Sequence, residues 1–356
     1  MQSDAALTAD EPSSLRVAMR PFRATDNRYT LMFGEGLQSA GIDVREMDIK
    51  SMSDFKDFDV LVIHWPNEFF FFNSIKQWVK GWILLALLSW RRRIKVIWVV
   101  HNVLPHVRNG RPSRMLRKAF LARVNGLIFL SRTSRDLLRQ TFPQFSDLPW
   151  TVISHGIYPP VGAQPSAAAV IGDRPVRLAF TGMVTPYKAP DQLAALVAAM
   201  PASQVELQIS GRCRDLELKA RLEQLAGDNV RLDLRYQEEA ELEAVVDASD
   251  AVVLPYRDIV NSGSALLALS RFRPVLAPSL GSLLELQQEV GKTWVHLYDG
   301  DLTAEVLSGF IDMLRQRQAP DAPDLAAHSW SHISQEVGRF ASMLGSVERA
   351  AFHRQV

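Results

Sequence analysis

Cysteine is nearly absent from this chain of 356 residues, because Cys213 is the only one. No disulfide can therefore form within the chain, which favours a reducing compartment while leaving export open. The longest uncharged apolar stretch in the most hydrophobic region, 81–90, is half the roughly 20 residues that cross a bilayer. Residues 1–12 lack the basic start and apolar core of a signal peptide, so none is expected.

A strong net charge is also missing, since the total is +1. That total hides an asymmetry. Residues 1–155 carry 22 Lys and Arg against 14 Asp and Glu, and residues 156–356 carry 18 against 25. Between Lys76 and Arg139 there are 15 basic residues and one acid, Asp136. A solvated basic face would explain this run, and so would an anionic partner of the N-terminal half.

Short runs rich in Val and Ile alternate with helix-like stretches, which predicts parallel sheets covered on both faces. The expected strands of the first half are 15–20, 44–47, 59–65, 95–100, 126–130 and 150–154. Those of the second half are 177–180, 205–210, 230–235, 251–255, 274–277 and 294–297. The pattern predicts an α/β protein with two Rossmann-like, doubly wound domains facing each other across a cleft.

A segment rich in Pro, Gly and Ala, 159–175, separates the two halves and reads as a linker. We therefore expect an N-terminal domain over 1–158 and a C-terminal domain over 176–328. Residues 329–356 are expected to begin as an amphipathic helix that crosses back to the first domain.

Residues 69–93 form an unusual segment that combines four Phe, three Trp and a basic end. Such a helix could lie in a membrane interface with its cations near anionic head groups. It could equally be a buried crossover helix of the first domain.

Ligands of doubly wound folds bind at the carboxyl ends of the strands, so the residues that end each strand are candidates. In the second half, 178–188 (LAFTGMVTPYK) places Gly182 and Lys188 after a strand, where a backbone can approach a phosphate and an ammonium can neutralise it. The next strand ends at Gly211 and Arg212, and the guanidinium could bind the same anion.

A second loop of the same half follows the strand that ends near Tyr256 and opens a helix. It consists of Asn261, Ser262, Gly263 and Ser264. Free N–H groups at a helix start bind anions, and Ser hydroxyls add donors. The alternative is a plain helix cap.

In the first half, His64 and Glu68 follow one strand and His101 follows the next, while Asp26 follows the first strand. Histidines and carboxylates at neighbouring strand ends could include a general base. Their spacing matches no specific metal signature.

These motifs carry a resemblance. The segments DVLVIHWPNE, HNVLPH, TGMVTPYK, VVLPYRDIVNSGSALLALSRFRPVLAP and EVGKTWVHLYDGDL resemble the two-domain glycosyltransferases of GT-B architecture. More narrowly, they are similar to the bacterial β-mannosyltransferase family that adds mannose in xanthan-type exopolysaccharide assembly. The resemblance implies a GDP-mannose donor, inversion at the anomeric carbon, and a polyprenyl-diphosphate-linked glycan acceptor at the cytoplasmic face of the cell membrane.

One departure from related families bears on mechanism. The large retaining families of this architecture carry two Glu, which fall at Ile259 and Leu267 here, and an Arg before the loop Lys, which is Met183 here. Both carboxylates are missing, which favours an inverting enzyme. Glu68 is the expected base, with Asp26 behind it and His101 orienting the sugar.

We expect no cofactor beyond the donor, no metal and no nucleic-acid partner. A peripheral location on an anionic membrane surface is expected. Two alternatives stay open: a transferase that retains configuration or uses a UDP-sugar, and an inactive homologue that binds membrane and partner proteins.

Overall fold

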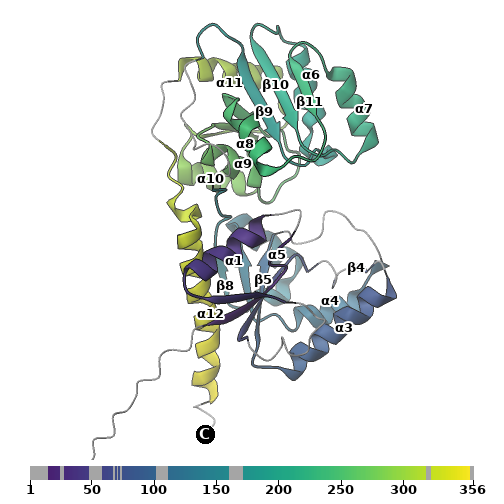
Figure 1. Cartoon of the computed structure of the whole chain (residues 1–356), viewed down its shortest axis with the longest axis vertical. Helices are drawn as coiled ribbons and strands as arrows, with labels where there is room; N and C mark the ends of the chain where they lie inside the picture. Colours follow the sequence, from purple (N-terminus) through teal and green to yellow (C-terminus); the bar gives the residue numbers. More distant parts are fainter. Residues whose placement is uncertain are drawn as a thin grey trace, which may run out of the picture. The chain divides into compact units, whose positions relative to one another are not determined.

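The computed structural model describes residues 15–24, 28–47, 58–66, 69, 71–72, 74–101, 111–159, 171–317 and 322–352. Its chain divides into two compact units (Figure 1). The first comprises 1–129, 142–153 and 330–356, and the second comprises 130–141 and 154–329. Most of the expected linker, residues 160–170, lies outside the described part.

The first unit contains a parallel sheet of six strands in the order β2-β1-β3-β5-β7-β8. The strands are β1 Arg16–Arg20, β2 Asp43–Glu46, β3 Val60–His64, β5 Lys95–Val100, β7 Gly126–Phe129 and β8 Trp150–Val152. Every residue of β3, β5 and β7 is buried, as in a sheet covered on both faces. A small antiparallel pair joins β4 (Phe71–Phe72) to β6 (Arg111–Pro112).

The second unit contains another parallel sheet of six strands, in the order β11-β10-β9-β12-β13-β14. Its strands are β9 Val176–Thr181, β10 Val205–Ser210, β11 Val230–Asp233, β12 Ala251–Val253, β13 Val275–Pro278 and β14 Val295–Tyr298. Counted from β9, this is the Rossmann order 3-2-1-4-5-6, which reverses direction between β9 and β12. Strands of both predicted sets are therefore present, and the predicted fold class is confirmed.

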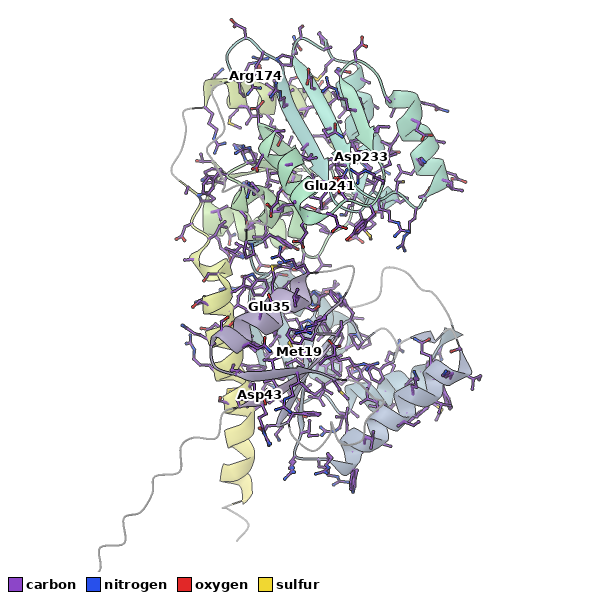
Figure 2. The ribbon with its side chains drawn as sticks, in the orientation of Figure 1. Met19, Glu35, Asp43, Arg174, Asp233 and Glu241 are labelled. Atoms are coloured by element: carbon purple, nitrogen blue, oxygen red, sulfur yellow. The ribbon has the colours of Figure 1, made fainter. Side chains whose placement is uncertain are left out.

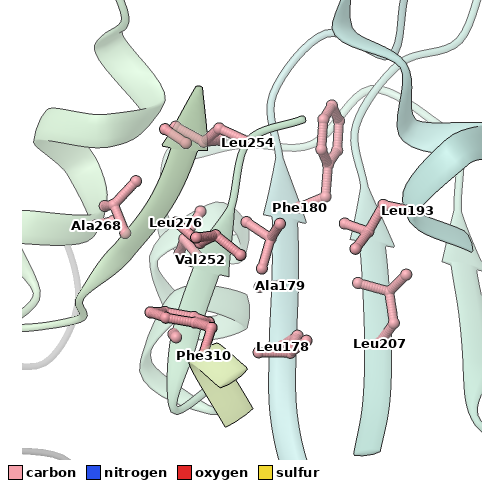
Figure 3. Packing of buried hydrophobic residues seen from close by; sticks show 14 of the residues in the cluster. Leu178, Ala179, Phe180, Leu193, Leu207, Val252, Leu254, Ala268, Leu276 and Phe310 are labelled. Atoms are coloured by element: carbon pink, nitrogen blue, oxygen red, sulfur yellow. The ribbon is translucent and has the colours of Figure 1, made fainter. Parts of the chain in front are cut away.

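A continuous apolar core fills the space between the second sheet and its helices (Figure 3). Leu178, Ala179 and Phe180 of β9 all lie in it, with Leu207 of β10 and Val252 of β12 on either side. Phe310 comes from α11, which packs against β9. Because β9 is central and every residue of it except Arg177 is buried, the loop that follows it has a rigid base.

The helices follow the strands in the expected alternation. Their bounds are α1 Tyr29–Ser39, α3 Ile75–Trp90, α4 Arg114–Leu121, α5 Arg132–Thr141, α6 Pro190–Ala198, α7 Leu216–Leu225, α8 Glu239–Asp247, α9 Gly263–Ser270, α10 Ser282–Val290, α11 Ala304–Gln316 and α12 Trp330–Phe352. Several begin with a side-chain cap, such as Ser74 before α3 and Thr303 before α11. The helix α12 packs along α1, where a Cβ on Gly36 would lie 2.8 Å from Ser334 Oγ.

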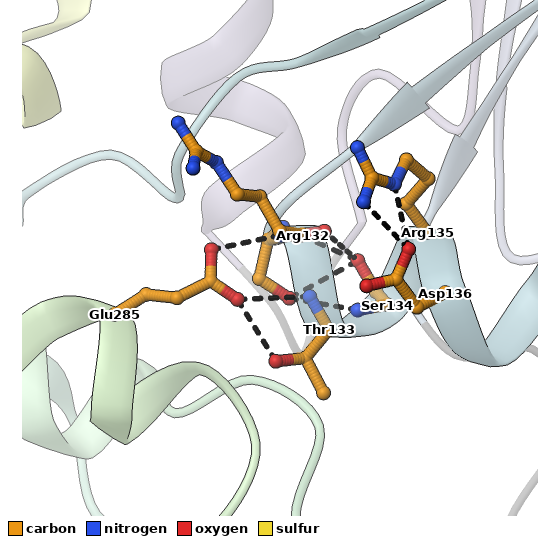
Figure 4. Close-up of polar contacts among 7 residues, drawn as sticks. Arg132, Thr133, Ser134, Arg135, Asp136 and Glu285 are labelled. Carbon is orange, nitrogen blue, oxygen red and sulfur yellow. Dashed lines mark hydrogen bonds and ion pairs between the residues drawn. The ribbon is translucent and has the colours of Figure 1, made fainter.

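In sequence, the helix α5 lies between β7 and β8 of the first sheet, but it belongs to the second unit. Glu285 of α10 accepts hydrogen bonds from the backbone N–H of Arg132 and Thr133, each at 2.8 Å (Figure 4). The Thr133 hydroxyl donates to the same carboxylate at 2.8 Å. A carboxylate at a helix start accepts hydrogen bonds from the free N–H groups and is attracted by the positive end of the helix dipole. Glu285 therefore fixes α5 to α10.

Charged groups at both ends of the second sheet are paired. At the amino end of β9, Arg174 binds Asp250 through two hydrogen bonds of 2.6 and 2.7 Å. Past the carboxyl end of β11, Arg235 forms ion pairs with Asp233 and Glu241. Figure 2 labels these two carboxylates in the second unit. The acidic excess of the C-terminal half is thus partly neutralised within the unit.

Candidate functional site

The reversal point of the second sheet brings together residues from three predicted loops. Gly182 directly follows β9 and has φ +103°, in the region that favours glycine. A Cβ at this position would lie 3.0 Å from Ser264 Oγ and 3.7 Å from Lys188 Nζ. Ser264 Oγ donates to the carbonyl of Thr181 at 3.0 Å, which ties the start of α9 to the end of β9.

The end of β10 lies against the same loop. Gly211 has φ +141°, and a Cβ on it would lie 1.9 Å from the carbonyl oxygen of Gly182. The Gly182 N–H donates to the backbone carbonyl of Ser210 at 3.1 Å, and the Val184 N–H donates to the backbone carbonyl of Arg212 at 3.1 Å. The backbone of Arg212 therefore borders the loop, while its side chain is exposed.

Lys188 is held by aromatic and backbone contacts. Its ammonium lies 5.3 Å from the centre of the Tyr256 ring, within the range of a cation–π interaction. Tyr256 is buried, and the next residue, Arg257, donates its N–H to the carbonyl of Tyr187 at 2.9 Å. The structure thus presents a positive charge beside Gly182 at the carboxyl edge of the sheet.

The start of α9 completes this edge. Ser262 is the cap, and its Oγ accepts from the Ala265 N–H at 3.3 Å. The helix begins at Gly263, so Ser264 lies in its first turn rather than before it. The first turn of a helix carries N–H groups without intrahelical partners and the positive end of the helix dipole, which are the features of anion sites.

Asn261 lines a different space. With Ser262 it borders a cavity of about 30 Å³, together with His155, Glu289 and His328. That volume holds about one water molecule. His328 Nδ1 lies 2.8 Å from the His155 carbonyl oxygen and donates to it when Nδ1 carries the proton. Nε2 of the same ring lies 2.8 Å from a carboxylate oxygen of Glu289.

In the first unit, His101 is found directly after β5 and beside His64, the last residue of β3. The His64 Nδ1 and His101 Nε2 atoms are 3.0 Å apart. The predicted bases Glu68 and Asp26 lie outside the described residues.

The GDP-mannose:glycolipid 4-beta-D-mannosyltransferase of Xanthomonas campestris pv. campestris is 31% identical over 283 residues, which cover 78% of each chain. This chain belongs to that glycosyltransferase family. No family model matches the chain.

Solved structures agree in fold. The sucrose-phosphate synthase of Thermosynechococcus elongatus superposes with a TM-score of 0.60 at 16% identity, covering 96% of this chain and 100% of the other. The catalytic domain of starch synthase IV from Arabidopsis thaliana gives 0.64 at 12% identity, covering 94% and 99%. The predicted family, GT-B architecture and enzyme class are confirmed.

This glycosyltransferase has a larger cavity next to the Lys188 loop. It measures about 410 Å³ and lies at the carboxyl ends of β12, β13 and β14. Tyr256 and Arg257 line it on one side, and Tyr298, Asp299 and Asp301 line the other. Tyr256 therefore contacts Lys188 and also lines a pocket of the size that small ligands occupy.

The sequence analysis missed two residues of this region. Thr181 is 1% exposed, and its Oγ1 finds no partner among the described residues. Its place as the last residue of β9 could have marked it. Tyr158 contacts α9, because a Cβ on Gly263 would lie 2.8 Å from its hydroxyl. Burial, followed by the negative charge of Glu239, raises the pKa of Tyr158. No sequence signal identified this residue.

The described residues hold no group of three or more His, Cys, Asp or Glu side chains placed to bind a metal. None of the described helices has both the length and the apolarity that crossing a membrane requires. The helix α3 buries one face, which includes Leu84 and Leu88, and exposes the other, which includes Ile75 at 72% and Ile83 at 48%. It is therefore a crossover helix with a second, solvent-facing apolar side.

Proposed function

We propose that this glycosyltransferase moves mannose from GDP-mannose to a polyprenyl-diphosphate-linked glycan and inverts the anomeric configuration. The observation that supports it most directly is the convergence of Gly182, Lys188 and Ser264 at the reversal point of the second sheet. A donor diphosphate there would accept hydrogen bonds from the first turn of α9 and meet the Lys188 ammonium. The relative from Xanthomonas campestris carries GDP-mannose and glycolipid in its name.

Catalysis in this proposal rests on stabilising the leaving group. The bond between the sugar and the diphosphate breaks, and negative charge grows on the departing nucleoside diphosphate. The Lys188 ammonium and the N–H groups of α9 are already oriented, so they need little reorganisation as that charge develops. Gly211 and Arg212 would border the same anion, and Asn261 and Tyr256 would support the loop that holds it.

Inversion is supported by what occupies the two carboxylate positions of retaining enzymes. Ile259 and Leu267 both pack against the apolar core of the second unit. Neither can act as a nucleophile or ion-pair with a cationic sugar. Direct attack by the acceptor hydroxyl then needs a base, and we assign that role to Glu68, with Asp26 second and His101 as a contact to the sugar.

The exposed apolar side of α3 supports the proposal of a lipid-linked acceptor. Ile75, Val79 and Ile83 recur every four residues and so form one stripe. They are 72%, 41% and 48% exposed, and Lys76 and Lys80 are exposed beside them. An apolar stripe flanked by cations suits the surface of an anionic membrane. We place the enzyme on the cytoplasmic face of the cell membrane.

A donor panel tests the proposal. Thermal unfolding of the purified protein is measured with GDP, GDP-mannose, UDP, UDP-glucose, UDP-glucuronate and dTDP. A ligand of the folded state stabilises by about 2.7 kcal/mol at a hundred times its Kd. Stabilisation by the guanosine compounds alone supports the donor assignment, whereas stabilisation by uridine compounds alone overturns it.

Product analysis tests the rest. The protein is incubated with GDP-mannose and a lipid-linked glycan, and the new linkage is read from its one-bond carbon–proton coupling by NMR. A β-linkage supports inversion of the α-linked donor, and an α-linkage rejects it. Binding of GDP-mannose without transfer to any glycolipid would favour the inactive homologue.

A further inference from the structure

Two buried histidines meet at the carboxyl edge of the first sheet. His64 ends β3 and is 1% exposed, and His101 follows β5 and is 9% exposed. The strands are neighbours, with His64 in register with Val99. The resulting distance of 3.0 Å between His64 Nδ1 and His101 Nε2 is that of a hydrogen bond.

Aromatic rings surround this pair. The His64 ring meets Phe33 and Tyr29 edge-on, at centroid distances of 5.0 and 5.8 Å. The His101 ring lies 4.6 Å from Trp65 and 4.9 Å from Tyr29. Burial lowers the pKa of His64 to about 3, because an imidazolium there would lose its hydration. His64 is therefore neutral at physiological pH.

A neutral imidazole has one N–H donor and one acceptor nitrogen. His64 Nε2 is buried and has no hydrogen-bond partner within the described part of the chain. A proton on Nε2 would thus be a buried donor without an acceptor, which proteins rarely tolerate. A proton on His64 Nδ1 instead donates to His101 Nε2. Only the lone pair on His64 Nε2 is then left without a hydrogen-bond donor. The second tautomer is favoured.

We propose that His64 is a positioning residue that fixes His101 as the neutral tautomer with its proton on Nδ1. His101 Nε2 is then occupied as an acceptor, and Nδ1 carries the proton of the ring. Because neither nitrogen then has a lone pair available to take up a proton, His101 would not act as the general base of the reaction. The last statement rests on the proposed function, whereas the tautomer does not.

Nitrogen-15 NMR of the substrate-free protein tests the tautomer. The ring signals of His101 are assigned by their loss in His101→Gln, and two-bond proton–nitrogen correlations at pH 7.5 report which nitrogen carries the proton. We expect His101 as Nδ1–H and His64 as Nδ1–H. His101 found as Nε2–H, or as the imidazolium, overturns the proposal without need of any variant.

A matched pair of substitutions separates hydrogen bonding from packing. Asn and Leu have the same shape, and the Asn amide nitrogen can occupy the place of His64 Nδ1. His64→Asn should keep the His101 tautomer and most of the wild-type kcat. His64→Leu should give a mixture of tautomers and lower kcat by about tenfold or more, because the His101 ring then loses its fixed protonation and orientation.

The two variants also distinguish the possible failures. Equal His101 spectra in His64→Leu and the wild type would reject the positioning role. Equal losses of kcat in His64→Asn and His64→Leu would show a purely structural role. A confirmed tautomer in a protein that transfers no sugar would leave this inference standing and reject the proposed function.

Discussion

Gly211 lies so close to Gly182 that a side chain on Gly211 would collide with the carbonyl oxygen of Gly182. A Cβ added to Gly211 would lie 1.9 Å from that oxygen. The contact sets how near the end of β10 can come to the loop after β9. Because that loop carries Lys188, the glycine pair determines where the positive charge of the candidate donor site lies.

We therefore expect Gly211→Ala to displace the loop. It combines a backbone clash with φ +141°, so it should destabilise the second unit by about 2 kcal/mol or more and weaken GDP binding. Thermal unfolding and calorimetric titration measure the two effects. Gly309→Ala is the control, because Gly309 lies within α11 with no atom within 4 Å of an added Cβ. It should raise stability by about 0.4–1 kcal/mol. Equal behaviour of the two variants would refute the contact.

Lys188 should contribute to donor affinity through its charge. A hydrogen bond to a charged group adds about 1.5–3 kcal/mol, so Lys188→Met should weaken GDP binding by about 10- to 150-fold. Lys292→Met removes an exposed lysine at the amino end of β14, the opposite edge of the sheet, and should leave the affinity unchanged. Calorimetric titration with GDP at low and high salt measures the Kd of both variants. An unchanged Kd in Lys188→Met would remove the anion site from this loop.

Loss of the Glu285 carboxylate should lower the local stability of α5 more than the free energy of unfolding of the whole protein. Glu285→Ala removes the acceptor of two N–H groups of α5, and lost caps cost about 0.5–2 kcal/mol. Hydrogen exchange should therefore accelerate in Arg132–Thr141. Glu223→Ala, on the exposed side of α7, is the comparison and should leave α5 unchanged. If α5 exchanges at the wild-type rate in both, Glu285 does not fix the helix.

Stability should fall in acid partly because of His155. Burial lowers the pKa of His155 to about 4, against a usual value of 6.5. The unfolded chain then takes up a proton as the pH drops below 6.5 while the folded chain does not, so stability present at neutral pH is lost down to about pH 4. Between pH 7.5 and 5.0 this loss amounts to about 2 kcal/mol. Thermal midpoints of the wild type should drop further over that interval than those of His155→Asn. The exposed His332→Asn should follow the wild type, and parallel curves for all three would refute the assignment.

The exposed stripe of α3 should bind anionic lipid. A double substitution of Ile75→Glu and Ile83→Glu should abolish sedimentation with vesicles of phosphatidylglycerol, while GDP binding stays intact. Lys76→Gln should weaken the same binding by about fivefold, as expected for about 1 kcal/mol per lysine near a charged surface. Leu216→Glu is the matched control, since Leu216 is 80% exposed on α7 of the second unit. If Leu216→Glu weakens vesicle binding as much as the double substitution, α3 is not the contact surface.

The strands and helices were predictable because buried parallel strands give uninterrupted runs of Val, Ile and Leu. The proximity of Gly182, Lys188 and Ser264 was predictable, since all three follow strand ends at one edge of the sheet. Their roles were not. Ser262 and Ser264 look alike in sequence, yet one caps α9 and the other binds the carbonyl of Thr181. The sequence also could not show that α5 belongs to the second unit, because Glu285 is 153 residues from Arg132.

The sequence by itself determined the enzyme family, the α/β class and the sheet edges at which the candidate residues lie. Hydrophobic periodicity and strand-end residues depend on residues that are close together in the sequence, so they can be recognised without the tertiary structure. Only the tertiary structure decided which atoms meet: Gly211 against Gly182, Lys188 over Tyr256, and His64 against His101. Such pairs depend on strand order, register and ring orientation, and these are set by the packing of residues that are distant in the chain.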